Sequence, residues 1–192
     1  TNNSRAIAIV FDNSGSMYDA GDQAWCRATY AMEVFASMLN TGDVLQIYPM
    51  HPITVGDKEY SMHEPFQITD AAQSSSIRDI YTKDAGGTPI ESIDCAVKGL
   101  QSVQNEKKYL IVLTDGGTFS KNGSGLSKDR TKKELDNRIQ ANAGEAMTVM
   151  YLGIGSDACV PNTKESDCFI KRQAVNTADV LSMLTDMCNM IF

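Results

Sequence analysis

A carboxylate and two hydroxyls stand within five residues, directly after an apolar run. The segment Asp12-Asn13-Ser14-Gly15-Ser16 follows residues 6–11, AIAIVF, whose composition predicts a buried β-strand. Open α/β sheets bind their ligands in loops at the carboxyl ends of parallel strands. Hydroxyl and carboxylate oxygens suit Mg²⁺, Mn²⁺ or Ca²⁺ rather than zinc or copper. The segment therefore indicates a site for a hard divalent cation.

Two further segments supply oxygen donors of the same kind. The apolar run 109–113 ends in Thr114-Asp115-Gly116-Gly117, which places a second carboxylate after a second buried strand. Between the two strands, Gly86-Gly87-Thr88-Pro89 predicts a tight turn into a helix, with Thr88 as N-cap and Pro89 in the first turn. We expect the three loops to converge at one edge of the sheet.

Each of these residues also has a simpler explanation. Ser14 and Ser16 are suitable caps for the helix that follows them, Thr88 for the helix after Pro89, and Asp115 is suited to orienting a turn. These explanations would require three polar loops to end neighbouring strands by coincidence. A shared binding site accounts for all of them together.

The elements that position these loops alternate along the chain. Short apolar runs at 6–11, 44–48, 109–113 and 147–152 predict strands, three of them buried on both faces. Helical periodicity predicts helices at about 25–39, 90–100 and 178–191, with weaker ones near 70–83 and 128–143. Residues 51–69 predict an edge hairpin. The fold class is therefore α/β, a doubly wound, mostly parallel central sheet flanked by helices, with an antiparallel edge hairpin.

Together the three loops resemble the von Willebrand factor type A (vWA) domain and its metal-ion-dependent adhesion site. The resemblance rests on Asp12-x-Ser14-x-Ser16, the Gly-Gly-Thr-Pro turn at 86–89 and Leu113-Thr114-Asp115-Gly116, in that order. The resemblance covers most of the 192 residues. It implies a Rossmann-like three-layer sandwich. The sequence departs from the common pattern at Met50-His51-Pro52 and at Gly116-Gly117-Thr118-Phe119, so no particular partner is inferred.

The resemblance implies a role for each donor. Ser14 and Ser16 would bind the cation directly, Thr88 and Asp115 directly or through water, and Asp12 in either way. Few anionic ligands leave Mg²⁺ electrophilic toward an incoming group. The implied partner is a protein that presents an Asp or Glu carboxylate to Mg²⁺, Mn²⁺ or Ca²⁺. The implied function is cation-dependent adhesion without catalysis.

Composition bounds the remaining possibilities. The 192 residues carry 42% hydrophobic side chains and a formal charge of −7, which fits one domain over 1–192. Because the sequence has no initiator Met, we expect the domain to be excised from a larger protein. The negative charge argues against nucleic acid as the main partner. No apolar stretch is long enough for direct membrane insertion. We expect an extracellular or cell-surface location, with a cytoplasmic one as the alternative.

Two other functions remain as alternatives. The first is an intracellular vWA assembly subunit that works with an AAA-type ATPase or a chelatase complex. The five cysteines bear on it, because a bridge between Cys159 and Cys168 would favour an oxidising compartment and free thiols a reducing one. The second is a Mg²⁺-dependent phosphatase of the haloacid dehalogenase type. That pattern has a second Asp where this chain has Ser14, so the general acid is missing.

Overall fold

A six-stranded sheet forms the centre of the protein. The computed structural model describes residues 3–82 and 86–192. The strand order is β11-β10-β7-β1-β2-β5, and every pairing is parallel except that of β5 with β2. The strands are β1 (Arg5–Phe11), β2 (Val44–Pro49), β5 (Phe66–Ile68), β7 (Lys107–Thr114), β10 (Thr148–Ile154) and β11 (Phe169–Ala174).

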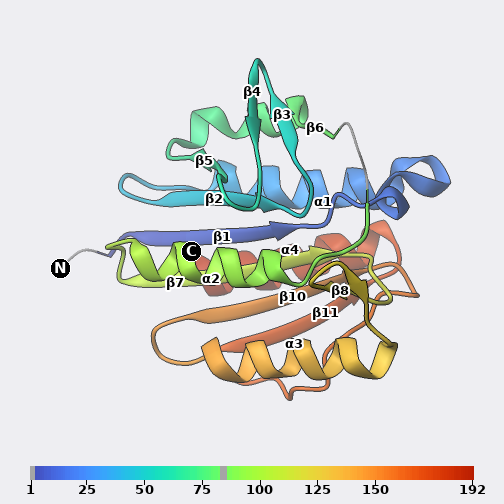
Figure 1. Cartoon of the computed structure of the whole chain (residues 1–192). Coiled ribbons are helices and arrows are strands. Elements are labelled where there is room, and N and C mark those ends of the chain that lie inside the picture. The colour runs from blue at the N-terminus through green and yellow to red at the C-terminus, as the bar shows by residue number, and fades with distance from the viewer. Residues whose placement is uncertain (1–2, 83–85) are drawn as a thin grey trace.

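Helices cover both faces of this sheet (Figure 1). The helices α1 (Asp19–Ser37) and α4 (Thr177–Ile191) pack on one face, and α2 (Glu91–Ser102) and α3 (Lys128–Asn142) on the other. The predicted fold class, a doubly wound, mostly parallel α/β sheet, is confirmed.

The apolar run of β1 is continuous because both of its faces are buried. Ile7, Ile9 and Phe11 belong to the core cluster under α1 and α4. Ala8 and Val10 belong to the cluster under α2 and α3. Alternating side chains of one strand thus reach two cores, which is why the run lacks the apolar and polar alternation of a half-exposed strand.

The structure differs from the sequence prediction mainly at the periphery. The hairpin β3 (Ile53–Val55) and β4 (Lys58–Tyr60) pairs with β6 (Tyr81–Thr82) in a separate sheet, while β5 alone forms the antiparallel edge of the main sheet. Within the helix predicted near 70–83, residues 71–79 form a 3₁₀ helix, η2 (Ala71–Asp79), and residues 81–82 belong to β6, while residue 83 lies outside the described residues. The strand β11 was not predicted, and neither were the short strands β8 (Ser120–Lys121) and β9 (Ser124–Gly125).

Two further sequence expectations concern the chain as a whole. Among the described residues, no helix has the length and apolar character needed to cross a membrane. All five cysteines are free thiols, so Cys159 and Cys168 do not form the bridge that the sequence left open. Cys159 is buried, and its carbonyl accepts a hydrogen bond from the Tyr151 hydroxyl at 2.7 Å.

Candidate metal centre

The strands β1 and β7 are neighbours and end at the same level. Phe11 pairs with Leu113, and the Asp12 backbone N–H donates to the Leu113 carbonyl at 3.0 Å. From β1 the chain passes to β2 on one side, and it later returns to β7 on the other side. Such a reversal of strand order opens a crevice between the loops that follow the two strands. Asp12 and Asp115 both lie in these loops.

Hydrogen bonds join four of the predicted site residues. The Ser16 hydroxyl donates to Asp115 Oδ1 at 2.9 Å, and the hydroxyls of Ser14 and Ser16 are 3.2 Å apart. Asp12 Oδ1 accepts the Ser14 backbone N–H at 2.9 Å. The structure thus brings two carboxylates and two hydroxyls into one cluster, although Ser16 and Asp115 are 99 residues apart.

Thr88, the fifth predicted residue, lies beside this cluster. It lines a depression of about 450 Å³ together with Ser14 and Ser16. A Cβ atom on Gly116 would lie 3.3 Å from Thr88 Cγ2, so glycine at 116 leaves room for the threonine. The prediction that Thr88 caps α2 is wrong. The N-cap is Ile90, and it makes no side-chain capping bond.

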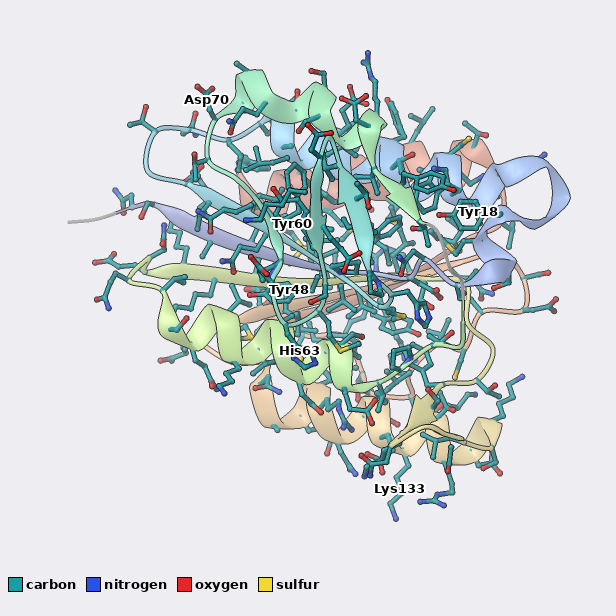
Figure 2. The ribbon with its side chains drawn as sticks, turned by 45° about the horizontal axis from the view of Figure 1, so that its top comes forward. Tyr18, Tyr48, Tyr60, His63, Asp70 and Lys133 are labelled. Atoms are coloured by element: carbon teal, nitrogen blue, oxygen red, sulfur yellow. The ribbon has the colours of Figure 1, made fainter. Side chains whose placement is uncertain are left out.

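The serines do not cap a helix either. Ser14 precedes a 3₁₀ turn, η1 (Gly15–Tyr18), and Ser16 lies within it. The helix α1 follows this turn, and its N-cap, Tyr18, has no side-chain capping bond. Tyr18 lies at the start of α1 (Figure 2) and stacks on Trp25 with ring centroids 4.4 Å apart. Trp25 also contacts Phe11. These aromatic contacts hold the turn against α1, and neither serine is the N-cap of that helix.

The electrostatics of the cluster are unbalanced. The side chain of Asp12 is fully buried and Asp115 is partly buried. Among residues 3–82 and 86–192, no lysine, arginine or histidine forms an ion pair with either carboxylate. Burial and the neighbouring Asp12 carboxylate raise the pKa of Asp115 to about 6. Two adjacent carboxylates without a counter-ion favour the binding of a cation or a proton.

The donor set is rich in hydroxyls and poor in charge. In the described part of the chain, no three or more His, Cys, Asp or Glu side chains gather where they could hold a metal ion. The cluster contains two carboxylates, and its other side-chain donors are the hydroxyls of Ser14, Ser16 and Thr88. Such a set excludes a soft metal cage and resembles sites in which a cation keeps several waters.

Three supporting residues were not predicted from the sequence. The Thr114 hydroxyl donates to Asp12 Oδ2 at 2.6 Å and accepts the Gly116 N–H at 2.9 Å. The Asn13 side chain donates to the His51 carbonyl at 2.8 Å and accepts the His51 N–H at 2.9 Å. Thr114 and Asn13 are next to predicted ligands in the sequence, which is a signal that could have identified them.

His51 connects two of the three loops. Its Nε2 lies 2.5 Å from the Gly87 carbonyl oxygen, so this nitrogen is the hydrogen-bond donor. A Cβ atom on Gly86 would lie 2.8 Å from the ring, which shows how closely the ring packs on that turn. Through these contacts, His51 links Asn13, which is next to Asp12, to Gly87, which is next to Thr88. The only sequence signal was the unusual Met50-His51-Pro52 segment after β2.

A second depression, of about 260 Å³, adjoins the cluster at Ser16 and Asp115. It shares Ser16 with the first depression and is also lined by Asp115, Gln23, Arg27 and Asp157. Side chains at its wall therefore come from α1 and from the loop after β10.

Two comparisons of the sequence with known proteins found no match. No profile of a protein family matches it, and no curated protein sequence matches it. Its fold, however, is similar to several solved structures. The PilB minor pilin from Streptococcus sanguinis superposes with a TM-score of 0.64 at 13% identity, covering 100% of this chain and 62% of that one.

Two other solved structures have a similar fold. The vWF domain of the type V pili tip protein Mfa5 from Porphyromonas gingivalis matches with a TM-score of 0.62 at 10% identity, covering 100% of this chain and 97% of that one. Proximal thread matrix protein 1 from the mussel byssus, with a zinc-occupied MIDAS motif, matches with a TM-score of 0.61 at 14% identity. That match covers 98% of this chain and 48% of the mussel protein, so the chain spans about half the mussel protein's length.

Proposed function

Because this chain has the fold of the von Willebrand factor type A domain, we propose that it is a divalent-cation-dependent protein-binding and adhesion module. The cation is Mg²⁺, with Mn²⁺ or Ca²⁺ as substitutes. Ser14, Ser16 and Asp115 hold it together with Thr88 and Asp12. The partner is a protein that presents an Asp or Glu carboxylate, and the module performs no catalysis.

The observation that carries this proposal is the spacing of the oxygens. In an octahedral Mg²⁺ site with bonds of about 2.0–2.1 Å, neighbouring ligand oxygens are about 2.9 Å apart. Ser16 Oγ is 2.9 Å from Asp115 Oδ1 and 3.2 Å from Ser14 Oγ. These separations fit adjacent corners of such a site, and a cation there would also offset the repulsion between Asp12 and Asp115.

The chemistry of a bound cation suits recognition of an acidic partner. A cation held mainly by hydroxyls keeps much of its charge and attracts a carboxylate from outside. The residues of this chain fix the position of that carboxylate through the Ser14–Ser16 loop and the Thr88 turn. The partner's acidic group then supplies specificity at the centre of a larger protein contact.

The similar structures support adhesion at a surface. They include a minor pilin, a pilus tip protein and a byssal matrix protein. We place this module on an extracellular or cell-surface part of a larger protein, with residues 1–192 as a single vWA domain. The zinc-occupied motif of the mussel protein supports cation binding in this fold. The all-oxygen donor set here favours Mg²⁺ over zinc.

The free thiols favour a second candidate. All five cysteines are unpaired, which suits a reducing compartment and a vWA subunit that works with an AAA-type ATPase or a chelatase complex. Thiol counting on protein isolated from its source separates the two settings. A Cys159–Cys168 bridge in that material favours the surface module, and five reactive thiols favour the assembly subunit.

Calorimetric titration with Mg²⁺, Mn²⁺ and Ca²⁺ tests the site itself. We expect saturable binding of one cation by the wild type and its loss in Asp115→Ala. Asp157→Asn is the matched control, because Asp157 lines the adjoining depression but lies outside the proposed ligand set. Equal binding by wild type and Asp115→Ala would contradict the proposal, as would no binding by the wild type.

A further inference from the structure

The two depressions that meet at Ser16 differ in charge. The larger one is walled by glycine and small hydroxyl residues, among them Gly86, Gly87 and Ser120, and no charged side chain lines it among the described residues. The smaller one contains Arg27 and Asp157 beside Asp115. Of the described side chains that line either depression, Arg27 alone is cationic.

The guanidinium of Arg27 is weakly engaged by the protein. Its Nη1 donates to the Val175 carbonyl and its Nη2 to Gln23 Oε1, each at 3.4 Å. Both distances exceed the usual range for N–H···O bonds, which ends near about 3.2 Å. Among the side chains that the structure describes, which do not include those of residues 19–22, no carboxylate forms an ion pair with Arg27. Arg27 therefore places a cationic group in the depression beside Asp115, and the contacts that hold this group are weak.

We propose that Arg27 receives a second carboxylate of the partner, so that the module recognises a protein segment with two acidic side chains. This inference rests on the proposed function, in which the first acidic side chain meets the cation beside Ser16 and Asp115. The second turns toward Arg27, because the larger depression offers no cationic side chain among the described residues. A planar guanidinium matches a carboxylate in two parallel hydrogen bonds.

Asp157 makes the subsite selective for this arrangement. It lines the same depression as Arg27 and repels an anion there, so a second acidic group binds only where Arg27 offsets that repulsion. A segment with one acidic residue gains nothing from Arg27. The quantity to measure is therefore the difference in binding affinity between a segment with one acidic side chain and a segment with two.

The test uses the whole chain, saturated with Mg²⁺, and peptides of five residues with acetylated and amidated ends. One peptide carries a single Asp among glycines, and three carry two Asp residues separated by zero, one or two glycines. Nuclear magnetic resonance titration gives each dissociation constant. We expect the best two-Asp peptide to bind about fivefold more tightly than the single-Asp peptide, as one exposed ion pair permits.

The variants Arg27→Gln and Arg27→Lys identify the residue responsible. Arg27→Gln should remove the fivefold difference without changing Mg²⁺ affinity or single-Asp binding, and Arg27→Lys should restore part of it. A single-Asp peptide with a free carboxyl terminus distinguishes a terminal carboxylate from a side chain, and we expect it to show no gain.

The outcomes separate this inference from the function on which it rests. An equal affinity for one-Asp and two-Asp peptides, or a difference that Arg27→Gln preserves, overturns the subsite while cation-dependent binding stands. A gain from the free carboxyl terminus as large as that from the second Asp overturns the choice of a side chain. Failure of Mg²⁺ to bind overturns the proposed function and this inference together.

Discussion

Two buried aspartates at opposite ends of the sheet are treated differently by the protein. Asp43 precedes β2 and accepts backbone N–H groups of Arg5 and Asn40, both at 2.8 Å. The Arg5 guanidinium adds an ion pair at 3.5 Å. Asp12, which follows β1, has an acidic neighbour, Asp115, and forms no ion pair with any described residue.

The difference separates a structural carboxylate from one that is suited to binding. A buried charge is tolerated when hydrogen bonds and an opposite charge compensate for its lost hydration. At Asp43 the chain supplies both from its own residues. At Asp12 it supplies hydrogen bonds from Ser14 and Thr114 but no positive charge. The missing charge is what an external cation provides, which is why we assign function to this end of the sheet.

The largest expected effect compares the same substitution at both aspartates. In Asp43→Asn the new amide group must face an N–H donor, because both carboxylate oxygens accept backbone N–H groups. We expect the free energy of unfolding to fall by about 3 kcal/mol, as when a buried charge pair is broken. In Asp12→Asn the amide can face Thr114, whose hydroxyl can rotate to accept, so we expect a loss of about 1 kcal/mol or less.

Urea unfolding in the presence of a chelator measures both values, and calorimetry measures Mg²⁺ binding. Asp43→Asn should keep its Mg²⁺ affinity under conditions where it is folded, while Asp12→Asn should lose it. Equal destabilisation by the two substitutions would contradict the distinction between a structural carboxylate at Asp43 and a binding carboxylate at Asp12. Retention of Mg²⁺ affinity by Asp12→Asn would exclude its carboxylate from the site.

A second prediction concerns pH. The folded-state pKa of Asp115 is raised to about 6 from the ordinary 3.8, so the protonated carboxyl is favoured in the absence of a cation. Mg²⁺ must displace that proton, and its affinity should therefore be constant well above pH 6 and fall by up to about tenfold per pH unit below it. Titrations between pH 5 and 8 measure this, and a flat profile would contradict it.

The same group affects stability without the cation. Because its pKa is raised on folding, its stabilising contribution is present below the ordinary value and is lost as pH rises through about 6. Unfolding measured in chelator at several pH values should show this decrease. Asp115→Asn provides the matched control and should lack it. A variant with the same pH dependence as the wild type would assign the decrease to another group.

Sequence patterns predicted the part of the site that is local. Asp12, Ser14 and Ser16 lie within five residues of a strand end, and the apolar runs of β1, β7 and β10 identified strands buried on both faces. Thr88 was expected beside them because its turn leads into a helix between the two strands, and the family resemblance added only its role as a ligand.

The remainder depends on tertiary packing that no local pattern encodes. Arg27 reaches the cluster from α1, and the β3–β4 hairpin pairs with β6 rather than with the main sheet. The strand β11 ends in Lys171-Arg172-Gln173-Ala174, a polar composition typical of an edge strand that is difficult to distinguish from a loop. The role of His51 was not predicted either, because its contacts with Asn13 and Gly87 join segments that are distant in the sequence.

The smallest expected effect is at His51. It is not one of the proposed ligands, but it contacts the loops that carry Asp12 and Thr88. In His51→Ala the backbone bonds to Asn13 remain, so the substitution removes only the ring contacts with Gly86 and Gly87. The Thr88 turn should then be held less firmly, and we expect Mg²⁺ affinity to fall by about tenfold or less, the lower limit for residues that orient ligands.

His63→Ala is the matched control, because His63 is an exposed histidine whose side chain contacts Cys95 on α2 rather than the cluster. Calorimetry should show a reduced Mg²⁺ affinity for His51→Ala and an unchanged Mg²⁺ affinity for His63→Ala. If His51→Ala binds Mg²⁺ as tightly as the wild type, the turn is held by its own contacts with Ser120, whose N–H donates to the Thr88 carbonyl at 2.9 Å. The positions of the ligands would then be set by β1, β7 and this turn alone. The difference between Asp12 and Asp43 would then be only that Asp43 has a positively charged partner and Asp12 has none among the described residues.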